Sequence, residues 1–160
     1  MSEDCDSTAG PLWTQIAERA EEQGTTAVAI CAELESALSE WPPEEAAEYR
    51  AELDMGPAGL ERLVHAGYRL LDLLTFFTAT GTNVVRAWTL RRGQTAYDAA
   101  GKVHTDMQRG FIRAEVIAYS DLMSAGDFGV ARERGLVRVE GRDYIVADGD
   151  ILHIRFSPPR

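Results

Sequence analysis

The spacing of apolar residues changes near residue 75, and this change constrains the fold more than any other feature of the chain. Over residues 60–74, apolar side chains recur at intervals of three and four, which predicts an amphipathic helix. Over residues 75–156, short apolar or alternating runs are separated by polar turns, which predicts strands. The 160 residues therefore divide into a mostly helical segment, 1–74, and a strand-rich segment, 75–157.

The helical segment contains one run that does not fit a helix. Helices are predicted over residues 11–23 and 33–39, where apolar residues fall at helical spacing, and over 44–53, which follows a proline. Between the first two, residues 26–31 are almost continuously apolar, which is typical of a strand that is buried on both faces. Such a strand requires neighbours, so we expect residues 1–35 to be loosely ordered or to pair with another protein chain through residues 26–31.

The strand-rich segment combines several strands with one helix. Thr95 is predicted to cap a helix that starts at Ala96, with Asp98 completing a capping box, and Gly110 is predicted to end it. Strands are predicted over residues 75–78, 84–90, 112–119, 136–140, 144–147 and 151–156. A mixed sheet with one helix packed across it is a β-grasp pattern, so the predicted fold class is α+β, with one strand left over in the helical segment.

Charge is distributed unevenly along the chain. The net charge is −10, but residues 1–80 hold 16 acidic and four basic residues, whereas residues 81–160 hold 10 acidic and 12 basic ones. An acidic first half would repel nucleic acid, while the second half could contact phosphate through local basic patches. Trp88 and Tyr144 could stack on bases, although aromatic residues of a β-grasp domain more often belong to the core. The candidate RNA-binding residues are Arg86, Arg91, Arg92, Lys102, Arg109, Arg113 and Arg142.

Catalytic and metal-binding patterns are not found in the sequence. His104 and Asp106 are expected to point in different directions at a helix end and so not to form a relay, and we expect them to cap the C-terminus of that helix. No spacing of histidine, cysteine or carboxylate residues matches a metal site. No run of 18 apolar residues occurs and the first residues are acidic, so we expect a cytoplasmic protein without a membrane contact.

Three motifs in the second half occur in an order that resembles a known family. They are Val85-Arg86-Ala87-Trp88-Thr89-Leu90, then His104-Thr105-Asp106 with Gly110-Phe111-Ile112-Arg113-Ala114-Glu115-Val116, then Asp148-Gly149-Asp150-Ile151-Leu152-His153-Ile154-Arg155-Phe156. Together they resemble the C-terminal TGS domain of the YchF / Obg-like ATPases, P-loop NTPases that associate with ribosomes. The resemblance implies a β-grasp TGS domain over 75–157. It also implies that residues 1–74 are a helical connector and a remnant of the NTPase domain, in which Cys31, Ala32 and Glu33 lie near the nucleotide base.

The expected function follows from this resemblance and from what the chain lacks. No Gly-x-x-x-x-Gly-Lys-Ser/Thr loop occurs, and no Asp-x-x-Gly segment precedes a helix, so the parts that position phosphates and magnesium are missing. Full-length relatives use ATP or GTP with Mg²⁺, but we expect no cofactor and no enzymatic activity for this chain. We expect an RNA- or ribosome-associated binding module. The alternatives are the C-terminal portion of a complete ATPase or GTPase, and a protein-interaction module that uses the acidic helices of residues 40–74.

Overall fold

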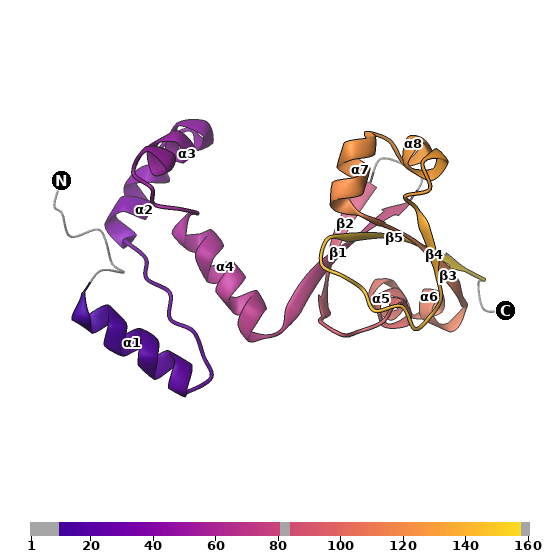
Figure 1. Ribbon diagram of the computed structural model, residues 1–160, viewed down its shortest axis with the longest axis horizontal. Coiled ribbons are helices and arrows are strands. Elements are labelled where there is room, and N and C mark those ends of the chain that lie inside the picture. Colours follow the sequence, from indigo (N-terminus) through magenta and orange to yellow (C-terminus); the bar gives the residue numbers. More distant parts are fainter. Residues whose placement is uncertain (1–9, 81–83, 158–160) are drawn as a thin grey trace. The chain divides into compact units, whose positions relative to one another are not determined.

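The chain divides into two compact units, residues 1–71 and residues 72–160 (Figure 1). The computed structural model describes residues 10–80 and 84–157. The first unit is built from helices, and the second contains a five-stranded sheet with helices. The predicted α+β class is therefore confirmed. None of the helices in the described ranges combines the length and the apolar character needed to cross a membrane.

One carboxylate joins three helices of the first unit. The helices of this unit are α1 (Pro11–Glu22), α2 (Ala32–Leu38), α3 (Pro43–Glu52) and α4 (Gly59–Leu70). Glu35 of α2 accepts hydrogen bonds from both terminal nitrogens of Arg50 on α3, at 2.9 and 2.6 Å. It also accepts one from the amide of Gly59, the first residue of α4, at 2.8 Å. One side chain therefore ties α2, α3 and α4 together.

The strand predicted over residues 26–31 is not formed. No described residue pairs with this segment in a ladder, and it runs as an irregular connection between α1 and α2. Ala27, Val28 and Ala29 are half-buried, and they line a pocket together with Trp13 and residues of α4. Packing of these small side chains against helices explains the continuous apolar run without a sheet.

The helix predicted to reach Leu74 ends at Leu70. Asp72 adopts a left-handed backbone conformation with φ 53°, which stops the helix. Its carbonyl oxygen accepts a hydrogen bond of 2.8 Å from the amide of Arg92. Leu73 then begins the first strand, two residues earlier than the predicted start at residue 75.

The sheet of the second unit has the strand order β2-β1-β5-β3-β4. Its strands are β1 (Leu73–Thr80), β2 (Val84–Arg91), β3 (Phe111–Ala118), β4 (Arg138–Glu140) and β5 (Asp150–Phe156). The pairing of β1 with β5 is parallel, and the other three pairings are antiparallel. The predicted strand at 144–147 is wrong, because its backbone bonds to the start of a helix. The amide of Ala96 donates to Tyr144, and the amide of Val146 donates to Gln94.

One face of the sheet is covered by α5 (Ala96–Val103) and α6 (Thr105–Arg109). The predicted capping box is confirmed, with reciprocal bonds between Thr95 and Asp98. The predicted continuous helix is interrupted at His104, whose extended backbone separates α5 from α6 and whose Nδ1 accepts from the amide of Asp106. This histidine therefore caps the start of α6, not the end of one long helix. The buried residues of this face are Leu74, Phe76, Leu90, Ala96, Ala99, Ala100, Ala114, Val116, Val146, Leu152 and Ile154.

The other face is covered by α7 (Tyr119–Ala125) and α8 (Phe128–Glu133), which the sequence did not predict (Figure 1). Gly126 ends α7 in a left-handed conformation, and the side chain of Asp127 caps α8 through two backbone amides. The buried residues Ile117, Ala131 and Ile151 form the core beneath these helices. The sheet is thus packed on both faces.

We expect Gly110→Ala to destabilise the second unit by about 1–3 kcal/mol, the usual cost of overfilling a packed site. A Cβ at Gly110 would overlap the carbonyl oxygen of Ser157, whose amide donates to the carbonyl of Gly110 at 2.9 Å. Urea unfolding followed by circular dichroism measures the change. Gly141→Ala is the matched control, because a Cβ there meets no atom within 4 Å. Equal stability of the two variants would contradict the prediction.

Candidate nucleic-acid interface

A buried carboxylate lies at the centre of a charged cluster in the second unit. Glu115 is in the middle of β3, and its side chain is only 8% exposed. Ala114 and Val116, its neighbours in the strand, belong to the core beneath α5 and α6. Because side chains alternate along a strand, Glu115 lies on the opposite face, which α7 and α8 cover. A carboxylate in this position requires partners to offset its desolvation.

Three basic side chains surround this carboxylate. Arg132 of α8 donates through Nη2 to Oε2 of Glu115 at 2.7 Å. Arg155 of β5 donates through Nε to Oε1 at 3.2 Å. His153, directly opposite Glu115 in the ladder of β3 and β5, has its Nδ1 3.7 Å from Oε2. The cluster therefore joins two strands and a helix.

The cluster shifts the pKa values of two members. Burial pushes the pKa of Glu115 up, but the hydrogen bond from Arg155 and the charges of Arg155 and Arg132 outweigh it and leave the pKa below the ordinary value of 4.5. Burial lowers the pKa of His153 below 6.5, and the charge of Arg155 lowers it further, against the opposing effect of Glu115. At neutral pH, Glu115 is ionised and His153 is uncharged.

The seven basic residues predicted from the sequence do not form one patch. Lys102 lies on α5 and Arg109 lies on α6. Arg86 is on the same face of β2 as Trp88, which packs against the core under α5. Arg113 and Arg91 lie on the opposite face of the sheet, because their strand neighbours Ala114 and Leu90 belong to the core under α5.

The remaining two predicted residues lie in turns and already have partners. Arg92 forms an ion pair with Asp72 at 3.4 Å. The guanidinium of Arg142 stacks on the ring of Tyr97, 4.4 Å from its centroid. Both faces of the sheet thus carry basic residues, and of the seven, Arg91 and Arg113 are on the face of Glu115.

The two aromatic residues considered for base stacking have structural contacts. Trp88 packs against the core and donates through Nε1 to the hydroxyl of Thr78 at 2.9 Å. The hydroxyl of Tyr144 donates to Asp150 at 2.8 Å and accepts from Arg138 at 2.9 Å. These contacts account for both residues as parts of the fold.

Sequence reasoning missed Glu115, Arg132, His153 and Arg155 as a group. Alternation along β3 and β5 places 115, 153 and 155 on one face, and this signal is present in the sequence. The register that sets Glu115 opposite His153 and the short helix that carries Arg132 are set by tertiary packing. The sequence therefore indicates the shared face of three of these residues, and only the structure shows that all four meet.

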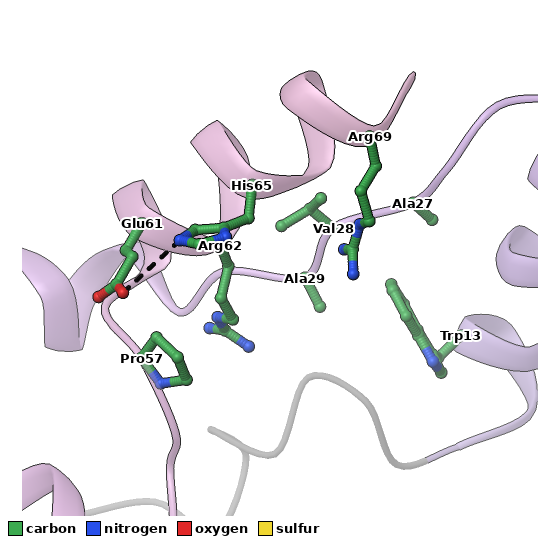
Figure 2. Close-up of a pocket in the computed structure, with 9 residues that line it drawn as sticks. All are labelled: Trp13, Ala27, Val28, Ala29, Pro57, Glu61, Arg62, His65 and Arg69. Atoms are coloured by element: carbon green, nitrogen blue, oxygen red, sulfur yellow. Dashed lines mark ion pairs between the residues drawn. The ribbon is translucent and has the colours of Figure 1, made fainter. Parts of the chain in front are cut away.

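The first unit contains a pocket of about 370 Å³ (Figure 2). Its polar lining comes from α4, and its apolar lining includes Trp13, Val28 and Ala29. The Nε of Arg62 is buried there without a hydrogen-bond partner among the described residues. Nε2 of His65 lies 3.7 Å from Oε1 of Glu61, which is one turn earlier on the same helix. The polar lining residues are Glu61, Arg62, His65 and Arg69.

The residues that the family resemblance places near a nucleotide base are at the start of α2. Cys31 precedes the helix and is half-buried, whereas Ala32 and Glu33 are exposed. The pocket of the first unit is lined by residues 27–29 of the preceding segment and not by these three.

Comparison with known proteins places the second unit in a defined family. The model of YchF-GTPase_C, described as a protein of unknown function (DUF933), matches residues 73–157, which is just over half of the chain. The ribosome-binding ATPase YchF of Haemophilus ducreyi is 46% identical over 147 residues, covering 92% of this chain and 40% of that protein. Obg-like ATPase 1 of Gallus gallus is 42% identical over 137 residues, covering 86% of this chain and 34% of that protein.

Solved structures agree with this placement. The YchF GTPase of Schizosaccharomyces pombe superposes with a TM-score of 0.76 at 30% identity, covering 92% of this chain and 39% of that one. A GTP-binding protein of Pyrococcus horikoshii superposes with a TM-score of 0.62 at 22% identity, a likeness of fold. The chain spans about two fifths of the length of the bacterial relatives it matches.

We expect Glu115 to make the stability of the second unit depend on pH in the acid range. Its pKa is lower in the folded chain than in the unfolded one, so its stabilising effect is complete above pH 4.5 and is lost as pH falls through the folded pKa. The difference in unfolding free energy between the wild type and Glu115→Gln should therefore shrink from about pH 7 to about pH 3. Urea titrations at each pH measure this difference. Glu18→Gln, in the first unit, should leave the pH dependence of the second unit unchanged, and a constant difference for Glu115→Gln would contradict the assignment.

Proposed function

Because this chain belongs to the YchF family through its C-terminal domain, we propose that it is an RNA- or ribosome-associated binding module. The proposal rests on one observation above the others: relatives 44–46% identical to this chain are named ribosome-binding ATPases. The domain that the family model matches is also the part of the chain in which basic residues outnumber acidic ones. A cytoplasmic location follows from this proposal.

Electrostatics support binding through the second unit. Residues 81–160 hold 12 of the 16 lysines and arginines of the chain, while residues 1–80 hold 16 of its 26 acidic residues. Neutralising phosphates with basic side chains releases counterions, so the affinity should fall as the salt concentration rises. The contact residues that we propose are the seven predicted from the sequence, distributed over both faces of the sheet.

We further propose that the 160 residues do not hydrolyse nucleotides by themselves. They contain no P-loop sequence, and phosphoryl transfer depends on the phosphate and magnesium positioning that this loop supplies. Any ATP or GTP with Mg²⁺ would then belong to a catalytic portion outside these residues.

A second candidate function is the C-terminal portion of a complete YchF-type ATPase or GTPase. The observation that favours it is coverage, because the chain matches only 40% of the length of a ribosome-binding ATPase. In that arrangement, residues 26–31 would contact the catalytic portion, and Cys31, Ala32 and Glu33 would lie near the nucleotide base.

The two functions predict different results when a P-loop NTPase domain of a relative is added in trans. A binding module should leave the ATP hydrolysis rate of that domain unchanged, whereas a missing portion of the enzyme should raise it. Phosphate release with and without the 160-residue chain measures this. Val28→Asp, which puts a charge into the proposed contact, is the control: it should abolish a genuine increase and leave an unspecific one intact.

We expect the chain to cosediment with ribosomes at low salt and to be released as salt is raised. Lys102→Glu should weaken this binding because it reverses a charge on an exposed residue of α5. Arg19→Glu is the matched control, since it makes the same charge change on an exposed residue of the first unit. Sedimentation before and after RNase treatment separates RNA from protein contact. Retention that RNase does not affect would instead support the protein-interaction alternative through the acidic helices.

A further inference from the structure

We infer that Glu115 holds Arg132 and Arg155 as a preformed binding site for the phosphodiester backbone of RNA. This inference rests on the proposed RNA or ribosome association and names the atoms that carry it. None of the four residues that meet at this site was among the seven predicted from the sequence. The site lies on the face of the sheet that α8 covers, at the ladder of β3 and β5.

The two guanidinium groups retain free hydrogen-bonding capacity. Each has five N–H donors, and the bonds to Glu115 use Nη2 of Arg132 and Nε of Arg155, with a longer contact of 3.5 Å from Nη2 of Arg155. No described residue accepts a hydrogen bond from Nη1 of either arginine. Their side chains are 60% and 45% exposed, whereas that of Glu115 is 8% exposed. The carboxylate therefore anchors both groups from below and leaves outer donors open to solvent.

The charge of the site favours an anion. Arg113 lies directly opposite Arg155 in the ladder and is exposed on the same face. Three arginines and one carboxylate then share this face, and His153 is uncharged at neutral pH because its pKa is lowered by burial and by Arg155. Two positive charges remain unbalanced among these five side chains. A simple pair of one arginine and one carboxylate would have no net charge.

The guanidinium groups of Arg132 and Arg155 are held in position by their hydrogen bonds to Glu115. A guanidinium offers a planar fork that matches the oxygens of a phosphate, and two forks held on neighbouring elements can bind one phosphate from two sides. Free arginine side chains lose rotamer freedom when they bind, but these two are already held by Glu115. The partner that fits is a chain of phosphates, and under the proposed ribosome association that chain is RNA.

The test uses variants that keep the charge and remove the fork. In the 160-residue chain, Arg132→Lys combined with Arg155→Lys should weaken binding to a labelled uridine homopolymer and to ribosomes about tenfold, because lysine is a point charge without a planar fork. The slope of log affinity against log salt should stay unchanged, since the number of charges is the same. Arg132→Ala with Arg155→Ala should instead reduce that slope by about 0.7 for each lost phosphate contact.

Arg19→Lys is the matched control. Arg19 also forms an ion pair with a glutamate, Glu22, at 3.2 Å, and it is 70% exposed, but it lies on α1. The affinity of the Arg19→Lys variant for the homopolymer and for ribosomes should stay within about twofold of that of the wild type, because this substitution removes no guanidinium from the proposed site. Fluorescence anisotropy gives the affinity for the homopolymer, and sedimentation gives that for ribosomes.

The outcomes separate this inference from the proposed function. Wild-type binding to RNA with the double lysine variant behaving like Arg19→Lys overturns the Glu115 site and leaves the RNA-binding module intact. Wild-type binding to neither probe overturns the proposed function and this inference with it. Loss of ribosome binding in the variant, without any wild-type binding to the homopolymer, overturns the assignment to the phosphodiester backbone alone.

A second measurement needs no substitution and so does not depend on the variants folding. Arginine-specific dicarbonyl modification of the wild-type chain, read by mass spectrometry, should slow at Arg132 and Arg155 when the homopolymer is present. Modification of Arg19 should be unaffected. Equal modification of Arg132 and Arg155 with and without RNA would overturn the inference.

Discussion

The sheet of the second unit depends on the parallel pairing of its first and last strands. β1 and β5 lie next to each other although the hydrogen bond that joins Thr75 to the Asp148 carboxylate spans 73 residues. The amide of Gly149 donates to the carbonyl of Thr75 at 2.8 Å, which places the turn before β5 beside the start of β1. Closing so long a loop costs entropy that only a well-packed sheet offsets. This single pairing joins the hairpin of β1 and β2 to β3 and β4, and no other described strand pairing makes that connection.

The two faces of the sheet around the central strand β5 are packed differently. On one face, alanines of α5 pack closely over Phe76 and Leu152, which produces a dense core. On the other face, α7 and α8 are short and cover fewer buried residues, so polar side chains of β3 and β5 occupy part of the surface. Glu115 and its arginines lie on that second face. A strand order without β5 beside β3 would separate Glu115 from Arg155.

Local signals in the sequence predicted the elements whose boundaries depend on neighbouring residues. The capping box of Thr95 and Asp98 is one, because both partners lie within a single turn. The end of α4 was misplaced because a left-handed aspartate, Asp72, bonds to the distant Arg92. Residues 144–147 have the composition of a strand, yet their backbone partners are at the start of α5. Helix α8 is only six residues long and is stabilised by its cap and its packing, so periodicity could not reveal it.

The same separation between local and distant information applies to the candidate site. Counting basic residues selects the second half of the chain and side chains on both faces of its sheet, because composition carries no information about register. A buried carboxylate is a stronger indicator, since it costs free energy unless cations are held against it. In this chain the compensation comes from two arginines whose other donors reach solvent. The interaction that stabilises the β3–β5 ladder therefore also fixes the orientation of the guanidiniums, and a substitution of Glu115 would alter both.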